Sequence, residues 1–374
     1  MSKVKQLEQF GQAVWLDYLR RELLTGGGLK KLIADDGVKG LTSNPAIFEK
    51  AITEGAEYRE FLAGPGRGGE REAESLYEKL AIADITMAAD QLAGVYAATG
   101  GRDGYVSLEV SPRLAHNTEA TVAEARRLWE SVDRRNLMIK VPGTPAGVPA
   151  IERLIAEGIN VNVTLLFAVD AYRDVAQAYQ RGLERRISEK KPIDSIASVA
   201  SFFVSRIDTE VDARLEKLAA AAGTVDERCG LEALRGKAAV ANARLAYVAY
   251  LEMIGAESWR VLEAHGARTQ RLLWASTGTK NAAYPDTLYV DELIGPDTVN
   301  TMPPATLDAF RHHGTPQERL MENPDGAREV MAQLAAAGVD LAAVTGKLLE
   351  DGVRLFDEAY GRLLAAIRRV RRAA

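Results

Sequence analysis

The sequence predicts an α/β fold, a single closed (β/α)₈ barrel of the TIM type with additional helices. Short β-like runs recur along the chain, amphipathic helical stretches separate them, and the runs number eight. Alternating strands and helices are typical of parallel βαβ units, and eight such units close a barrel in about 250 residues. A doubly wound open sheet is the competing architecture.

Each expected strand is a short apolar or alternating run bounded by turn residues. Helical patterns fill most of the gaps, as in TEATVAEARRLWESV at 118–132 and AGVPAIERLIAEG at 146–158. The glycine cluster GPGRGGE at 64–70 is expected to be a loop. The eight expected strands lie at 13–17, 38–42, 105–110, 137–141, 159–166, 195–204, 271–276 and 297–302.

The length beyond a minimal barrel is mostly helical. Residues 207–255 are rich in alanine and charge with helical spacing, and a long C-terminal helix is expected at about 340–372, packed across the body. We find no repeat and no linker, so we expect one domain over 1–374. One apolar stripe follows the C-terminal helix: Val353, Phe356, Tyr360, Leu363, Ile367 and Val370.

Composition excludes several classes of function. A net charge of −5 gives no reason to expect nucleic acid or anionic lipid as a partner. No run approaches the roughly 18 apolar residues of a membrane span, and the N-terminus lacks a signal-peptide core. The single cysteine, Cys229, suits a reducing cytoplasm, where we expect the protein. Four histidines without zinc-site spacing indicate no metal site.

Polar residues gather at the carboxyl ends of the expected strands. In a barrel enzyme these ends meet at one mouth, which forms the active site. One amine, two carboxylates, amides and hydroxyls would therefore converge. In strand order they are Asp17, Ser43 with Asn44, Glu109, Lys140, Asn162 with Thr164, Ser201 with Arg206, and Ser276.

Most of these residues also have an ordinary structural interpretation. Lys140, inside the apolar run LMIKV, could be an ion-paired or snorkelling lysine. Asn44 precedes a proline and fits a helix N-cap. Asn162 and Thr164 alternate with valines and could form a polar sheet face. Asp17 could pair with an arginine one turn later.

A lysine beside two carboxylates suggests Schiff-base chemistry on a carbonyl substrate. The amine must be neutral to attack, and the apolar neighbours of Lys140 disfavour its charge. Glu109 would then move protons during imine formation, and Asp17 would take the proton of a substrate hydroxyl as the adjacent carbon–carbon bond breaks. A phosphate would be held by Arg206, with Ser276 and Lys280.

Six motifs together resemble the transaldolase family of the pentose phosphate pathway, in its longer bacterial-type branch. They occur in order over roughly residues 12–310: GLTSNPAIF, VSLEVSPRLAHNTEAT, LMIKVPGT, GINVNVTLLF, SFFVSRID and LWASTGTKN. The resemblance implies a cofactor-free barrel that transfers a dihydroxyacetone unit. The donor would be sedoheptulose 7-phosphate or fructose 6-phosphate, and the acceptor glyceraldehyde 3-phosphate or erythrose 4-phosphate. We expect a monomer or homodimer.

The resemblance also implies roles for single residues. Lys140 matches the imine-forming lysine, Glu109 the carboxylate that works through a water, Asp17 the acid/base at the hydroxyl, and Thr164 a threonine holding that water. The substrate-binding positions matched are Asn44, Asn162, Ser201 and the phosphate-binding Arg206. Many members read Ser-Phe-Arg after the seventh strand, whereas here Ser276 is followed by Thr-Gly-Thr and Lys280. Whether Lys280 replaces the second phosphate-binding arginine stays open.

Two other functions compete with the transferase. A sugar-phosphate aldolase of the same superfamily would release free dihydroxyacetone, and a sugar-phosphate-binding protein would do no chemistry. Glu109 and Phe203 favour the transferase, since aldolase relatives tend to carry Gln and Tyr there. A binding protein leaves Lys140 beside Glu109 unexplained.

Overall fold

A computed structural model describes residues 1–62 and 69–373, and over these residues eight parallel strands form one closed barrel in chain order. All eight predicted strands and the barrel are confirmed. Positions 64–68 of the loop expected at 64–70 lie outside the described residues. The strands are β1 Gln12–Asp17, β2 Val38–Thr42, β3 Tyr105–Glu109, β4 Leu137–Pro142, β5 Val161–Leu166, β6 Ser198–Phe203, β7 Arg271–Ala275 and β8 Thr298–Met302.

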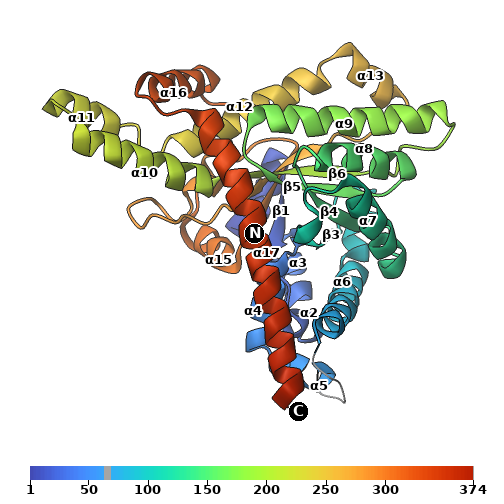
Figure 1. Ribbon diagram of the computed structural model, residues 1–374. Helices are drawn as coiled ribbons and strands as arrows, with labels where there is room; N and C mark the ends of the chain where they lie inside the picture. Colours follow the sequence, from blue (N-terminus) through green and yellow to red (C-terminus); the bar gives the residue numbers. More distant parts are fainter. Residues whose placement is uncertain (63–68, 374) are drawn as a thin grey trace.

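Helices surround the barrel, and α10, α11 and α16 extend to one side of it (Figure 1). The helical content expected over 207–255 is present as α10 to α12. The helices are α1 Lys3–Gln6, α2 Arg21–Thr25, α3 Gly28–Asp36, α4 Pro45–Glu54, α5 Arg59–Leu62, α6 Glu70–Ala98, α7 Thr118–Val132, α8 Gly147–Glu157, α9 Val169–Ser188, α10 Ser205–Ala221, α11 Val225–Glu232, α12 Ala238–Ile254, α13 Glu257–Ala264, α14 Leu288–Asp291, α15 Pro304–His313, α16 Pro324–Ala336 and α17 Leu341–Ala373, with short 3₁₀ turns η1 Leu7–Phe10, η2 Ala56–Tyr58 and η3 Pro112–Leu114.

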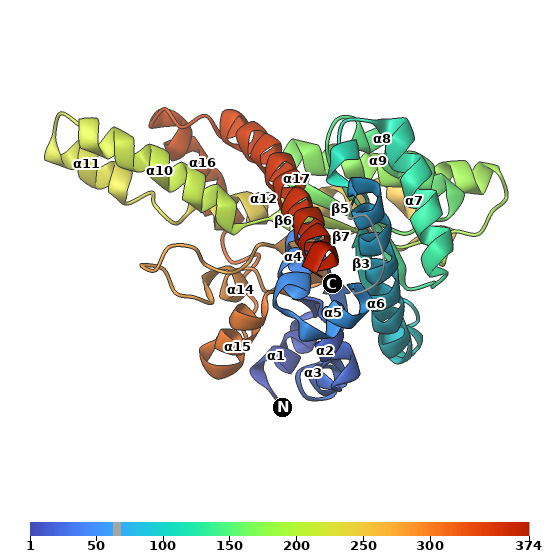
Figure 2. The same ribbon diagram turned by 60° about the horizontal axis from the view of Figure 1, so that its bottom comes forward.

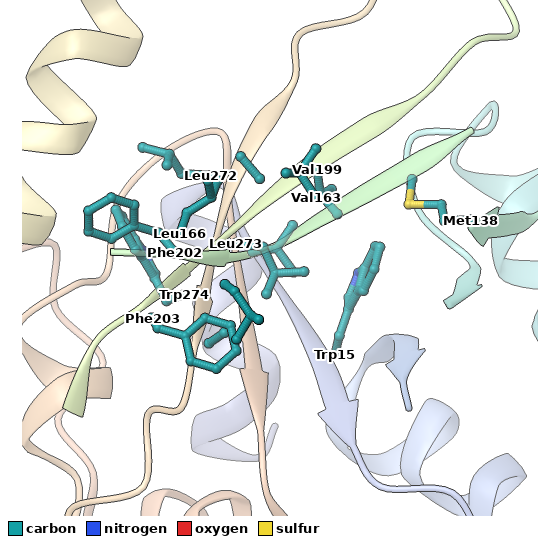
Figure 3. Close-up of a cluster of buried hydrophobic side chains, with 14 of the residues drawn as sticks. Trp15, Met138, Val163, Leu166, Val199, Phe202, Phe203, Leu272, Leu273 and Trp274 are labelled. Atoms are coloured by element: carbon teal, nitrogen blue, oxygen red, sulfur yellow. The ribbon is translucent and has the colours of Figure 1, made fainter. Parts of the chain in front are cut away.

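Large side chains from several strands are buried in the core, and Figure 3 shows a cluster of them that includes Trp15 of β1, Phe202 of β6 and Trp274 of β7. The Trp15 and Tyr105 rings lie 6.2 Å apart. Residue 40 must be glycine, because a Cβ there would lie 2.5 Å from the Trp15 ring. At the amino ends of the strands, Arg271 pairs with Asp103 at 2.9 Å in a buried ion pair. This end of the barrel is therefore filled, and the opposite mouth is left for a site.

The C-terminal helix α17 crosses the barrel in both views of the molecule (Figures 1 and 2) and contacts α4, α6 and α10. Gly352 lets it approach closely, because a Cβ there would lie 2.8 Å from the side chain of Leu165 on β5. Phe356, Tyr360 and Leu363 of the predicted stripe are buried. The predicted helix across the body is confirmed.

Among the described residues, no single helix combines the length and apolarity of a membrane span. Helices α16 and α17 meet that criterion only as a pair, with a bend of 92° between them.

Candidate active site

Lys140 lies on β4 at the mouth of the barrel with its amine enclosed by protein. Its Nζ donates a hydrogen bond to the Ser43 carbonyl oxygen at 3.1 Å and lies 3.5 Å from Glu109 Oε2. The Phe356 ring centroid is 5.6 Å from the same nitrogen. The side chains of Lys140 and Glu109 are only 5% and 2% exposed. The ion-paired interpretation of Lys140 is therefore correct as geometry, and it leaves a buried primary amine facing the mouth.

The strand register places Glu109 beside this amine. Glu109 on β3 is paired with Lys140 on β4, which is paired in turn with Asn162 on β5. Burial raises the pKa of Glu109 to about 7, against the opposing effect of the Lys140 charge. Apart from that ion pair, neither carboxylate oxygen accepts a hydrogen bond from the described part of the chain. Such a carboxyl can both give and take a proton near neutral pH.

Asp17 is the second carboxylate at the mouth. Burial raises its pKa, while Lys140 and a hydrogen bond from Thr42 Oγ1 to Asp17 Oδ1, 2.7 Å long, lower it by less. The pairing with an arginine one turn later does not occur. Arg20 pairs with Glu57 and Arg21 with Asp84, so Asp17 stays available at the mouth.

Amides and hydroxyls continue the polar wall. Ser201 Oγ donates to Asn162 Oδ1 at 2.7 Å, and Asn162 Nδ2 donates to Ser107 Oγ at 3.0 Å. The hydroxyl of Thr164 is buried and has no hydrogen-bond partner among the described residues. Asn44 caps α4 through its Oδ1, which accepts from the Ile47 amide at 3.0 Å, as the N-cap interpretation predicts. Each polar group except Thr164 is thus held in place by a neighbour.

Arg206, in the first turn of α10, supplies the cationic end of the site. Its guanidinium lies 5.5 Å from the Phe203 ring centroid, and burial lowers its pKa. Ser276 follows β7 with a φ of 56°, a left-handed conformation that is costly for serine, and its Oγ lies 3.0 Å from Ser205 Oγ. Lys280 is exposed at the rim and acts electrostatically on Asp17. This grouping of cation and hydroxyl suits an anion.

One cavity of about 180 Å³ brings most of these groups together, and we call it the mouth cavity. Glu109 and Asn162 are not among its lining residues, but each contacts a residue that is. Glu109 pairs with Lys140, and Asn162 accepts a hydrogen bond from Ser201. The predicted site residues that line it are Asp17, Asn44, Lys140, Thr164, Ser201, Phe203, Arg206, Ser276 and Lys280.

Sequence reasoning missed Phe356, Thr42 and Thr301, which also line the mouth cavity. Phe356 belongs to the predicted apolar stripe, but nothing in the sequence indicated what the stripe covers. Thr42 closes the second strand and was open to the same strand-end argument as its neighbours. Among the described residues, no group of three or more His, Cys, Asp or Glu side chains is arranged to hold a metal ion.

The chain is similar to known proteins over nearly its whole length. The family model described as transaldolase/fructose-6-phosphate aldolase matches residues 14–367. The chain is 50% identical to a protein named transaldolase from Parafrankia sp., over 98% of each chain. It is also 50% identical to a transaldolase of Thiobacillus denitrificans, over 98% of this chain and 100% of the relative. A protein named transaldolase 2 from a Nostoc species is 46% identical over 97% of this chain and 96% of its own length.

Proposed function

This chain belongs to the transaldolase/fructose-6-phosphate aldolase family, and from that premise we propose that it is a transaldolase. It moves a dihydroxyacetone unit from sedoheptulose 7-phosphate or fructose 6-phosphate to glyceraldehyde 3-phosphate or erythrose 4-phosphate. The observation that carries the proposal is the buried amine of Lys140, 3.5 Å from Glu109 and in one cavity with Arg206. The proposal takes residues 1–374 as one domain that acts in the cytoplasm as a monomer or homodimer.

The reaction begins with imine formation. The neutral amine of Lys140 attacks the ketone carbon of the donor, giving a carbinolamine. Glu109, protonated below its raised pKa of about 7, gives a proton through water to the departing hydroxyl. Thr164 holds that water, and its buried hydroxyl without a partner among the described residues supports this role.

Asp17 carries out the cleavage. It takes the proton of the hydroxyl next to the bond that breaks, and the bonding electrons move into the iminium to give an enamine on Lys140. The aldose phosphate leaves, an acceptor aldose enters, and the enamine attacks its carbonyl. Asp17 returns its proton to the new hydroxyl, and water then releases the product ketose.

The remaining groups bind the substrate. The dihydroxyacetone part of the ketose lies against the amides and hydroxyl of Asn44, Asn162 and Ser201. The phosphate at the opposite, aldose end of the ketose lies against Arg206, Ser276 and Lys280. Phe203, with Glu109, favours transfer over the aldolase alternative.

A test of the proposal is turnover of fructose 6-phosphate with and without erythrose 4-phosphate. We expect sustained release of glyceraldehyde 3-phosphate only with the acceptor, because the enamine stays on Lys140 until an aldehyde takes it. A coupled absorbance assay measures the release. Sustained release of free dihydroxyacetone without acceptor would instead establish the aldolase.

Arg206→Ala should raise KM for phosphorylated ketoses at least about tenfold, roughly 1.4 kcal/mol or more, because a buried phosphate loses its charged partner. Steady-state kinetics with phosphorylated and unphosphorylated ketoses measure the difference. Unphosphorylated donors should be nearly unaffected. Lys280→Ala should have a smaller effect of the same kind.

The matched control is Arg214→Ala on the same helix, where the arginine pairs with Glu210 at 3.0 Å outside the mouth cavity. It should leave both KM values unchanged. Equal losses on both substrate types in Arg206→Ala would show that Arg206 is a structural residue.

A further inference from the structure

A second cavity of about 260 Å³ lies on the other side of Glu109, and we call it the rear cavity. Residues of α6, α7, α17 and the connection after β3 line it, including Tyr77, Glu124 and Tyr360. Glu109 lines the rear cavity and Lys140 the mouth cavity. The two charged groups are 3.5 Å apart, so this ion pair lies between the two cavities.

Glu109 lines the rear cavity, and both of its carboxylate oxygens are buried with no partner among the described residues apart from the Lys140 ion pair. Burial raises the pKa of Tyr77, and the charges of Tyr360 and Glu109 raise it further. The Tyr77 ring packs edge-on against Tyr360, with the ring centroids 5.6 Å apart. The cavity opens to solvent at an edge formed by two ion pairs, Arg113 with Glu74 at 3.0 Å and Arg127 with Glu78. These four side chains are 36–49% exposed. A cavity of this size, lined by both polar and apolar side chains and open at its edge, has room for several waters, each occupying about 30 Å³.

The proposed reaction requires water to pass Glu109 while the mouth cavity is occupied. Carbinolamine breakdown cleaves the carbon–oxygen bond, the hydroxyl leaves with the Glu109 proton as one water, and the nitrogen lone pair forms the iminium. Hydrolysis consumes one water and returns its proton to Glu109. A donor bound through Lys140 and Arg206, which both line the mouth cavity, would extend across that cavity and block that route.

We propose that the rear cavity is the water port of the active site, through which the water of imine formation leaves and the water of hydrolysis enters at Glu109. The inference rests on the proposed Schiff base at Lys140. It assigns a function to a cavity that the binding of the sugar phosphate does not use.

Filling the rear cavity tests the proposal. Ala81 on α6 lines the cavity and is buried, so Ala81→Leu places three more carbons in it. Two rates are measured with fructose 6-phosphate in H₂¹⁸O: entry of ¹⁸O at the ketose carbonyl, and accumulation of the borohydride-trapped imine. If the released water cannot leave, it hydrolyses the imine again and returns the original oxygen to the ketose carbonyl, so no ¹⁸O enters. We expect the ratio of exchange to trapping to fall at least about tenfold.

The matched control is Ala327→Leu on α16, which fills a separate cavity of about 270 Å³ away from the site. It should keep the parent ratio, because a merely structural change lowers both rates together. Ile82→Phe, at the same rear cavity, replaces Ala81→Leu if that variant does not fold. An unchanged ratio in a folded rear-cavity variant overturns the water port. Absence of any trapped imine in the parent overturns the proposed function instead, so the two failures are distinguishable.

Discussion

Lys140→Met should abolish turnover, by at least about a thousandfold, and leave a protein at least as stable as the parent. The thioether fills nearly the same volume and removes a buried charge, but it cannot form an imine. Borohydride with fructose 6-phosphate should label the parent at Lys140 alone, and peptide mass spectrometry locates the adduct. Thermal unfolding measures the stability.

Two further variants separate chemistry from structure. Lys140→Arg should fold and be inactive, since guanidinium keeps its charge and cannot form the imine. The matched control is Lys39→Met on β2, a strand lysine paired with Glu8 at 3.3 Å, which should keep full activity. An adduct on another lysine, or an active Lys140→Met, contradicts the mechanism. Unfolding of Lys140→Met would mean that the ion pair with Glu109 is structural.

The two carboxylates should block different steps. Glu109→Gln should slow imine formation by about 100-fold, because the amide cannot supply the proton for dehydration. Asp17→Asn should form the imine at a normal rate and accumulate the uncleaved ketose on Lys140. Rapid quenching with borohydride measures both the rate of labelling and the mass of the bound sugar.

The pH dependence gives an independent check on Glu109. Its pKa is raised to about 7, so it is protonated below pH 7 and loses the proton as the pH rises through that value. The rate of imine formation, which needs the acid form of Glu109, should therefore fall above about pH 7 in the parent, and Glu109→Gln should lack this decline.

For the two carboxylates, an Asp17→Asn variant that forms no adduct, or that cleaves normally, would contradict the roles assigned to Asp17 and Glu109.

The strand ends were predictable because parallel strands in chain order place their carboxyl ends at one mouth. Lys140 beside Glu109 and Asn162 follows from that order once the register is known. Successive side chains along a strand point to opposite faces, so the sequence also indicates which residues of the strand segments LMIKV and VNVT point inward.

The position of helices over the mouth could not be predicted in the same way. A stripe at three- and four-residue steps shows that the C-terminal helix packs, but its crossing angle depends on distant contacts such as Gly352 against Leu165. Phe356 above Lys140 was therefore missed. The rear cavity was missed for the same reason, because α6, α7 and α17 form it jointly.

The placement of α17 has a consequence for biosynthesis. The chain is made from its N-terminus, and all eight strands precede α17 in the sequence. Phe356, which lies over the amine, belongs to α17 and so comes after the last of these strands. A nascent chain can thus carry every strand residue of the mouth and still lack the aromatic ring above it. The enclosure of Lys140 is completed only after this part of α17 has been made, so a chain terminated before residue 356 would leave its amine open to solvent.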